Sequence, residues 1–241
     1  MGAFSFIRRG LAITILALGL LLLAATGCGV PDPTPEPELT LDEVLERTSD
    51  HLLSFQTAQF QMIDEMESGR KFFEQTLKSV DGKVQAPDRT DLLVNVESPV
   101  LGFVQIGIIA VGDSAMMQFA SGAPWNPLPL DQVPFNFSGL GMTLSDLLPK
   151  IQNIELTGRE TVNGIETIRI DGDLVSEDLK NLITSADSGH PIDLTVWVDA
   201  EDQSLRQIRI VGNVFNDDGP GTSRLIILSE YDEPVDIQLP G

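Results

Sequence analysis

The sequence predicts an α+β fold in which a single strongly curved antiparallel sheet of about ten strands forms a half-barrel, with helices packed on its concave face. Three observations favour this fold. From Gln56 onward, apolar side chains recur mainly with a period of two, which is the period of a strand. Short turn signals join most of these segments, and such short connections indicate antiparallel neighbours. Only three segments have the apolar spacing of a helix.

The first helix is predicted to begin after Thr40. Thr40 and Glu43 have the T-x-x-E spacing of a capping box, in which each side chain binds the backbone N–H of the other residue. Apolar residues then recur at helical spacing, which predicts one face that packs on the sheet. The residues of this face are Leu41, Val44, Leu45, Thr48, Leu52 and Phe55.

The first half of the sheet is predicted from five segments with strand periodicity. The segments are Phe60–Glu67, Phe72–Val80, Asp91–Glu97, Val100–Val111 and Ser114–Ala120. Asp81-Gly82 and Gly112-Asp113 are predicted to be hairpin turns. The fourth segment is apolar on both faces, so we expect both of its faces to be covered.

Regular alternation stops after this half. Residues 121–138 contain four prolines and three aromatic residues, and we expect a long loop. A short helix is predicted over Leu140–Ile151, with Thr143 or Ser145 as its cap and Pro149 at its end. A loop of this length in a compact domain is usually functional, so Ser121–Ile151 is predicted to be a gate.

The second half of the sheet begins with the clearest hairpin of the chain. Asn163-Gly164 joins Ile154–Val162 to Ile165–Leu174, and Asn-Gly is the strongest two-residue hairpin signal. Ser176–Ala186 is predicted to be a helix capped by Ser176. The remaining strands are predicted at Ile192–Asp199, Leu205–Val214 and Thr222–Tyr231.

The N-terminus predicts export and lipidation. Arg8-Arg9 precedes an uncharged apolar run, Leu11–Ala25, whose roughly 15 residues suit a signal-peptide core and fall short of the about 20 needed for a membrane span. Small residues then lead to Cys28, as in a bacterial lipobox. Residues 1–27 are therefore predicted to be a lipoprotein signal peptide, with acyl chains on Cys28. A plain membrane anchor and twin-arginine export are the alternatives.

Residues 28–38 are predicted to be the lipidated cysteine and a proline-rich tether. Four prolines alternate between Pro31 and Pro37, and proline favours an extended, semi-rigid chain. At about 3.1 Å per residue, the tether holds the domain formed by residues 39–241 within roughly 25–30 Å of Cys28. The predicted location is the extracytoplasmic face of the cell membrane, with the membrane contacted through the acyl chains.

Charge and composition narrow the function. The chain has 36 acidic and 15 basic residues and a formal net charge of −21, which argues against nucleic acid as a partner. Cys28 is the only cysteine, so no disulfide and no cysteine-based metal site are expected. Calcium ligands could come from Asp171-Gly172-Asp173 or Asp217-Asp218-Gly219, but turn chemistry explains both better.

Motifs of known catalytic sites are missing. The two histidines, His51 and His190, have no neighbouring residues that suggest a catalytic triad, and the sequence has no H-E-x-x-H, G-x-S-x-G or phosphate-binding glycine loop. We therefore predict no enzyme activity, no catalytic residue, no metal and no cofactor. A hydrolase built on paired carboxylates stays open as an alternative, because 36 acids offer many chance pairs.

Apolar residues in the middle of the chain suggest the lining of a cavity for an apolar ligand. The strand Val100–Val111, the methionines after it, and the segment from Trp125 to Leu148 combine many apolar side chains with few polar groups. Such surfaces suit ligands of variable shape. An ordinary core beneath a loop is the alternative. Phe135 and Phe137 belong to this set.

Several segments together resemble one known family. In chain order they are LDEVLERTSDHL, AVGDSAMMQF, LSDLL, TGRETVNGIETIRIDGDL and LTVWVDAEDQSLRQIRI. They make the chain similar to the LppX/LprAFG family of mycobacterial-type lipoproteins, which shares its half-barrel with the LolA/LolB carriers. The resemblance covers about 190 residues and is a pattern, with no catalytic signature. This sequence departs from the family in its acidic surface and its tether.

The resemblance implies binding of a lipid or glycolipid between sheet and helices and its carriage through the cell envelope. The resemblance implies the position of the ligand site only as a region of this chain. The residues of that region are Val104, Ile106, Ile108, Met117, Phe119, Leu140, Leu144 and Leu148. Trp197 is predicted to be core. An envelope transporter is a candidate partner. The alternative function is a non-catalytic structural or sensing lipoprotein that binds an envelope protein through its acidic face.

Overall fold

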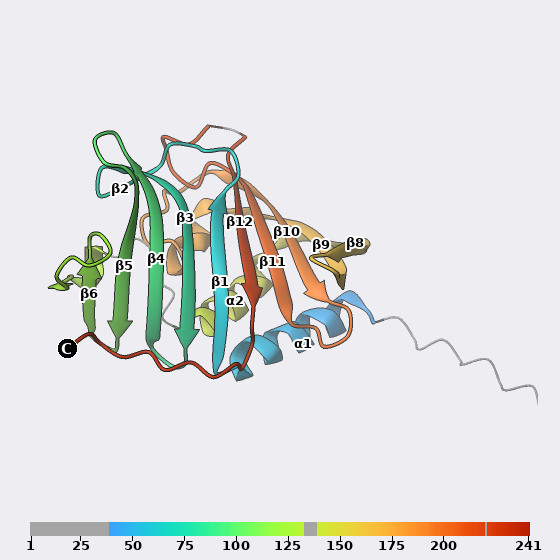
Figure 1. Cartoon of the computed structure of the whole chain (residues 1–241). Coiled ribbons are helices and arrows are strands. Elements are labelled where there is room, and N and C mark those ends of the chain that lie inside the picture. The colour runs from blue at the N-terminus through green and yellow to red at the C-terminus, as the bar shows by residue number, and fades with distance from the viewer. Residues whose placement is uncertain (1–38, 133–138, 220) are drawn as a thin grey trace, which may run out of the picture. The chain divides into compact units, whose positions relative to one another are not determined.

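A computed structural model describes residues 39–132, 139–219 and 221–241. Its elements confirm the predicted fold class, a single open antiparallel sheet with few helices (Figure 1). The helices are α1 (Leu41–Ser54) and α2 (Leu140–Leu147), with short 3-10 turns at Leu130–Gln132, Leu148–Lys150 and Ser176–Asn181. The strands are β1 (Thr57–Asp64), β2 (Lys71–Phe72), β3 (Gln75–Gln85), β4 (Arg89–Ser98), β5 (Gly102–Val111), β6 (Ser114–Gln118), β7 (Asn126–Pro127), β8 (Gln152–Val162), β9 (Ile165–Val175), β10 (Pro191–Asp199), β11 (Leu205–Gly212) and β12 (Ser223–Ser229).

The strand order is β7-β6-β5-β4-β3-β1-β12-β11-β10-β9-β8, and β2 pairs only with β3. All of the pairings are antiparallel. The described sheet has twelve strands, two more than the roughly ten predicted, because β2 and β7 are two-residue pairings without a periodic pattern of their own. Strand β1 lies between β3 and β12, so the first and last long strands are neighbours.

The two helices lie behind the inner face of the sheet (Figure 1). The capping box predicted for α1 is present: the Glu43 N–H donates to Thr40 Oγ1 at 3.4 Å, and the Thr40 N–H donates to Glu43 Oε2 at 2.8 Å. Helix α1 buries Val44, Thr48 and Leu52. It packs tightly on α2, because a Cβ on Gly141 would lie 2.0 Å from the backbone oxygen of Leu52.

Two local predictions are wrong. Asp81-Gly82 is not a turn but lies inside β3, and the chain turns after Gln85 instead. Gly82 is needed there because a Cβ would lie 2.3 Å from the ring of Phe60 on the neighbouring strand. The residues predicted to form a helix over Ser176–Ala186 make only a 3-10 turn, Ser176–Asn181.

The two ends of helix α2 differ from those predicted from the sequence. It begins at Leu140 after Gly139, with neither Thr143 nor Ser145 as its cap. Ser145 Oγ instead lies 2.7 Å from Ser49 Oγ on α1. The helix ends at Leu147, and Pro149 lies in the 3-10 turn that follows.

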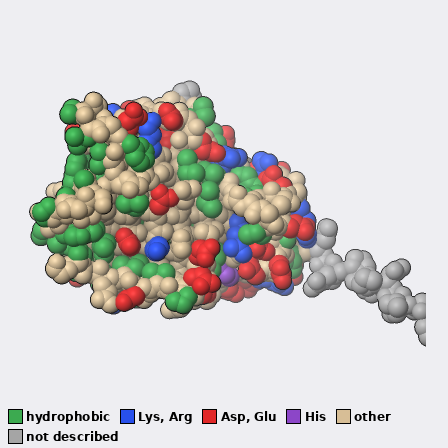
Figure 2. Space-filling view, viewed as in Figure 1, with side chains coloured by type: hydrophobic (Ala, Val, Ile, Leu, Met, Phe, Trp, Pro, Cys, Tyr) green, Lys and Arg blue, Asp and Glu red, His purple; other side chains and the backbone are tan. Residues whose placement is uncertain are grey.

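The prediction that both faces of the β5 region are covered is wrong as well. Ile106, Ile108 and Ala110 are buried on the inner face, but Phe103 on the outer face is 66% exposed. The outer face of an antiparallel sheet tolerates solvent, so an apolar residue there need not be covered. Figure 2 shows this outer face, on which acidic and basic side chains are scattered among uncharged ones.

Candidate functional site

The inner faces of β4 and β5 form an apolar wall. Val94 pairs with Ile106, and Leu92 pairs with Ile108, and all four side chains are buried. Because side chains alternate along a strand, every second residue of both strands points to this side. Met117 on β6 extends the wall, since it lies directly opposite Ile108.

Helix α2 supplies the facing apolar surface. Leu140, Leu144 and Leu147 are buried, and their spacing of three and four residues places them on one side of the helix. Leu148, in the 3-10 turn that follows, is also buried. The sheet and the helix therefore enclose a layer made of branched aliphatic side chains.

The structure places the eight predicted lining residues as follows. Five belong to the hydrophobic core: Ile106, Ile108, Leu140, Leu144 and Leu148. Val104 and Met117 are partly buried and pack against it. Phe119 lies beyond the end of β6 and is 39% exposed, so it stands apart from the others.

Trp125 lies on the other side of the sheet. A Cβ on Gly107 would lie 3.1 Å from its ring, and Gly107 points outward because its neighbours Ile106 and Ile108 point inward. The expectation that Trp125 lines an inner cavity is therefore wrong. Phe135 and Phe137, and with them part of the predicted gate, lie outside the described residues.

An apolar groove opens where α1, α2 and the β3–β4 turn meet, and we call it the helix groove. It has a volume of about 190 Å³. Its lining residues are Leu52, Leu53, Phe55, Val84, Gln85, Ala86, Pro87, Arg89, Gly139, Leu140, Gly141 and Met142. Leu53 and Met142 are 58% and 64% exposed, and Arg89 is the only ionisable residue of the set.

Of the residues that line the helix groove, the sequence predicted Leu140 as a ligand-site residue and Met142 as part of the apolar lining. The others come from three segments whose meeting depends on the strand order and on the α1–α2 contact. The sequence held one local signal: Leu53 is a large apolar residue outside the predicted apolar face of its helix. The structure leaves Leu53 and Met142 exposed. An exposed apolar pair at one opening is typical of a ligand or partner site.

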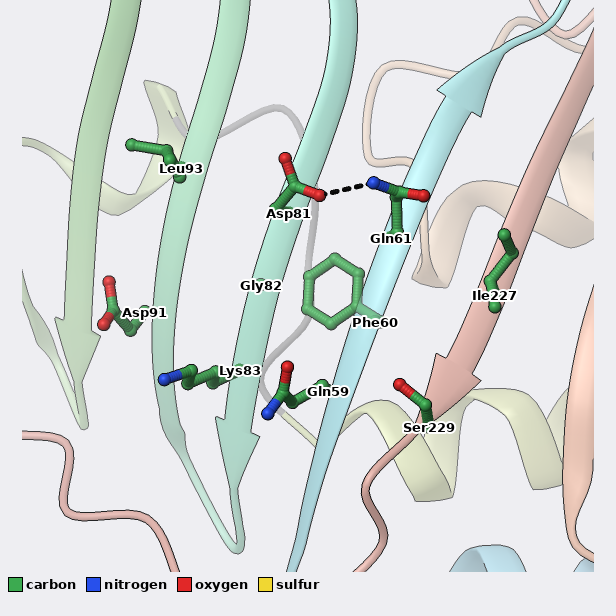
Figure 3. A pocket seen from close by; sticks show the side chains of 10 residues that line it. All are labelled: Gln59, Phe60, Gln61, Asp81, Gly82, Lys83, Asp91, Leu93, Ile227 and Ser229. Atoms are coloured by element: carbon green, nitrogen blue, oxygen red, sulfur yellow. Dashed lines mark hydrogen bonds between the residues drawn. The ribbon is translucent and has the colours of Figure 1, made fainter.

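A second hollow lies on the outer face, and we call it the outer trough (Figure 3). Its volume is about 420 Å³. It is lined by Gln59, Phe60, Gln61, Asp81, Gly82, Lys83, Asp91, Leu93, Ile227 and Ser229, from β1, β3, β4 and β12. Most of these side chains are polar.

A chain of side-chain hydrogen bonds crosses the outer face beside this trough. Gln61 Nε2 donates to one oxygen of Asp81 at 2.6 Å, and Asn95 Nδ2 donates to the other at 2.7 Å. Gln105 Nε2 then donates to Asn95 Oδ1 at 3.0 Å. Burial raises the pKa of Asp91 on the trough wall, and the nearby Lys83 partly opposes that rise. The trough is thus larger than the helix groove, and six of its ten lining side chains are polar or charged.

Known catalytic geometry is missing from the described residues. The ring of His51 packs edge-on against Tyr231 at 4.8 Å between centroids, and His190 Nε2 lies 2.9 Å from Asn216 Oδ1. Among the described residues, neither imidazole ring forms a hydrogen bond with a serine side chain or an ion pair with a carboxylate. In the part of the chain that the structure describes, no three His, Cys, Asp or Glu side chains come together as a metal site.

The two aspartate pairs considered for calcium have internal partners. Asp218 is buried with Arg224, at 2.7 Å between Oδ1 and Nη2, and accepts the N–H groups of Val214 and Phe215. Asp171 lies within β9, so its prediction as a turn residue is wrong. There it accepts hydrogen bonds from Thr157, Thr195 and Arg169.

Trp197 is buried, as predicted, but not within the inner core. Its indole N–H donates to Glu160, and the guanidinium of Arg209 lies 5.2 Å from its ring centroid. Polar and charged side chains therefore cover it on the outer face of the sheet.

Cys28 and the predicted signal peptide and tether lie outside the described residues. Among the residues that are described, no helix is long and apolar enough to span a membrane.

Comparison with known proteins agrees with this architecture. The chain resembles the crystal structure of LprF from Mycobacterium bovis with a TM-score of 0.60 and 16% identity, over 82% of this chain and 95% of that one. It resembles the crystal structure of the lipoprotein LppX from Mycobacterium tuberculosis with a TM-score of 0.55 and 19% identity, over 83% of this chain and 100% of that one. At such identities these likenesses concern the fold.

Sequence comparison adds the family. The lipoarabinomannan carrier protein LprG from Mycobacterium leprae is 29% identical over 98 residues, which are 40% of this chain and 39% of that protein. The match thus spans about two-fifths of the length of this curated relative. The family model of the LppX_LprAFG lipoproteins matches residues 71–237, more than half of the chain. The chain therefore belongs to the LppX_LprAFG lipoprotein family.

Proposed function

We propose that this protein is a lipid-anchored lipoprotein that takes up a lipid or glycolipid between its sheet and its helices and carries it within or across the cell envelope. One observation carries the proposal: the inner face of the half-barrel is apolar, is covered by two short helices, and meets the surface at an apolar groove. Membership of a lipoprotein family supports it, as does the name of the LprG relatives, which are carriers of lipoarabinomannan.

The energetics favour acyl chains as cargo. Each methylene removed from water contributes about 0.8 kcal/mol, so even part of one chain supplies several kcal/mol of gross driving force. Ile106 and Ile108 are fully buried in this structure. Deep insertion of a chain between β5 and α2 therefore requires the two layers to separate, and we propose that the ligand enters from the helix groove as they do so.

Anchoring belongs to the same proposal. Acyl chains on Cys28 would attach the carrier to the extracytoplasmic face of the cell membrane, and the proline-rich segment before Leu39 would set its reach. We propose no enzyme activity. The geometry of the described residues supports binding, since the histidines and the buried aspartates are engaged in structural contacts.

The proposal is tested with residues 29–241, which include the whole compact unit Leu39–Gly241, produced in a bacterial host. Native mass spectrometry should find a co-purified lipid, and the delipidated protein should take up a fluorescent lipid. A protein that carries no lipid and takes none up would contradict the proposal.

A protein-binding role is the second candidate, and one observation favours it. The β4–β5 turn presents Val100, Leu101 and Phe103, which are all more than half exposed. Exposed apolar side chains that lie close together often mark a partner surface. In that case Leu101→Ser would weaken capture of an envelope protein and leave lipid uptake unchanged.

A further inference from the structure

Arg89 is an isolated positive charge beside an apolar surface. It is the first residue of β4 and one of the residues that line the helix groove. Its Nη1 donates to the backbone oxygen of Ile237 at 2.8 Å, which fixes the side chain and leaves its other N–H groups for further partners. Within residues 39–132, 139–219 and 221–241 no carboxylate lies within ion-pair distance of it.

Among the described residues, Arg89 shares this lack of an ion pair with Arg47 and with four lysines. Six other arginines form ion pairs with Asp or Glu: Arg70, Arg159, Arg169, Arg206, Arg209 and Arg224. Arg89 differs from the other unpaired cations in its place, because it is the one ionisable residue among the described residues that line the helix groove.

The remaining surface of the helix groove is suited to an acyl chain. Leu52, Leu53 and Phe55 line it from α1, and Leu140 and Met142 line it from α2. The volume of 190 Å³ is below the range of about 300–1,000 Å³ that encloses a whole drug-sized ligand. The groove can therefore hold part of an amphiphile while its headgroup stays in water.

We propose that the helix groove selects amphiphiles with an anionic headgroup, a carboxylate or a phosphate, which Arg89 binds while the acyl chain lies against Leu53 and Met142. This inference rests on the proposed function and adds the charge of the ligand to it. Arginine binds both headgroups through paired N–H donors. Without this cation, the acidic surface would repel an anion, so Arg89 gives the groove its selectivity.

The experiment uses delipidated residues 29–241 and two pairs of probes with 16-carbon chains, at concentrations below micelle formation. Palmitate is compared with hexadecanol, and lysophosphatidylglycerol with the net-neutral lysophosphatidylcholine. The wild-type protein should bind the anionic probe of at least one pair roughly tenfold more tightly, as expected for a charge-assisted hydrogen bond that water partly screens. A preference in one pair alone identifies the headgroup as a carboxylate or a phosphate.

The variants separate charge from shape. Arg89→Gln should abolish the preference, Arg89→Lys should retain part of it, and the control Arg159→Gln, which removes an arginine from β8, should leave it unchanged. Leu53→Asp should weaken binding of all four probes. Leu53 is largely exposed, so this change should not unfold the domain.

Three results would overturn the inference. Equal affinity for both members of each pair, or a preference that survives Arg89→Gln, would remove Arg89 from recognition while the proposed function stands. Unchanged binding by Leu53→Asp would place the acyl chain elsewhere. If the wild-type protein binds none of the probes and carries no lipid, both the inference and the proposed function fail.

Discussion

The helix groove and the outer trough lie on opposite sides of one sheet and differ in chemistry. The groove is smaller, at 190 Å³ against 420 Å³. Among the described residues that line it, one arginine is the only charged residue, and most of its surface is apolar. The trough carries two carboxylates, a lysine and two glutamines (Figure 3). The size of a hollow alone therefore does not identify the site of an apolar ligand, because burying unpaired polar groups costs free energy.

The largest expected difference between the two sides concerns β5. Ile106→Ala, on the inner face, should lower the free energy of unfolding by about 2–5 kcal/mol, because it leaves a cavity in a packed layer. Gln105→Ala, on the outer face, removes one partly exposed hydrogen bond and should cost about 1 kcal/mol or less. Urea denaturation of both variants measures this. Similar losses would mean that the inner face is not packed as a core.

A smaller effect is expected at the contact between the helices. Gly141→Ala places a Cβ 2.0 Å from the Leu52 backbone oxygen, so α2 must move away from α1. We expect a loss of about 1–3 kcal/mol in stability, as for other overpacked sites. Gly219→Ala is the control, since nothing lies within 4 Å of its added Cβ. If Gly141→Ala is as stable as the control in thermal unfolding, the helices do not meet as described.

The smallest effect is expected in the outer trough and depends on pH. The pKa of Asp91 is raised in the folded protein, so its contribution to stability is fully present below its unfolded pKa near 3.8 and is lost as the pH rises through the folded pKa. Asp91→Asn, which stays neutral, should therefore be more stable than the wild type at pH 7, by less than about 1 kcal/mol because water screens the site. The two should match near pH 3. Melting temperatures at both pH values measure this, and a less stable variant at pH 7 would contradict it.

The fold could be predicted where one short segment decides the local structure. Thr40 and Glu43 are three residues apart and start α1 as expected, and Asn163-Gly164 turns the chain between β8 and β9. Asp81-Gly82 resembles Asn163-Gly164 in sequence, but it lies within β3 and does not form a turn. Its glycine makes room for Phe60 on the next strand, a contact that the local sequence does not reveal.

The candidate site could be predicted only in part for the same reason. Alternation placed Ile106 and Ile108 on the inner face, and helical spacing placed Leu140 and Leu144 opposite them. The position of Arg89 beside the helices depends on where the β3–β4 turn falls, and that turn was misplaced at Asp81-Gly82.

The pairing of β1 with β12 has a consequence for the order of folding. Strand β1 becomes an interior strand only when residues 223–229 have paired with it. Contacts this distant in sequence make folding slow, because a long loop must close before they form. For a chain that is exported as we propose, slow closure has a benefit: the sheet stays incomplete until its last strand has followed the rest out of the cytoplasm.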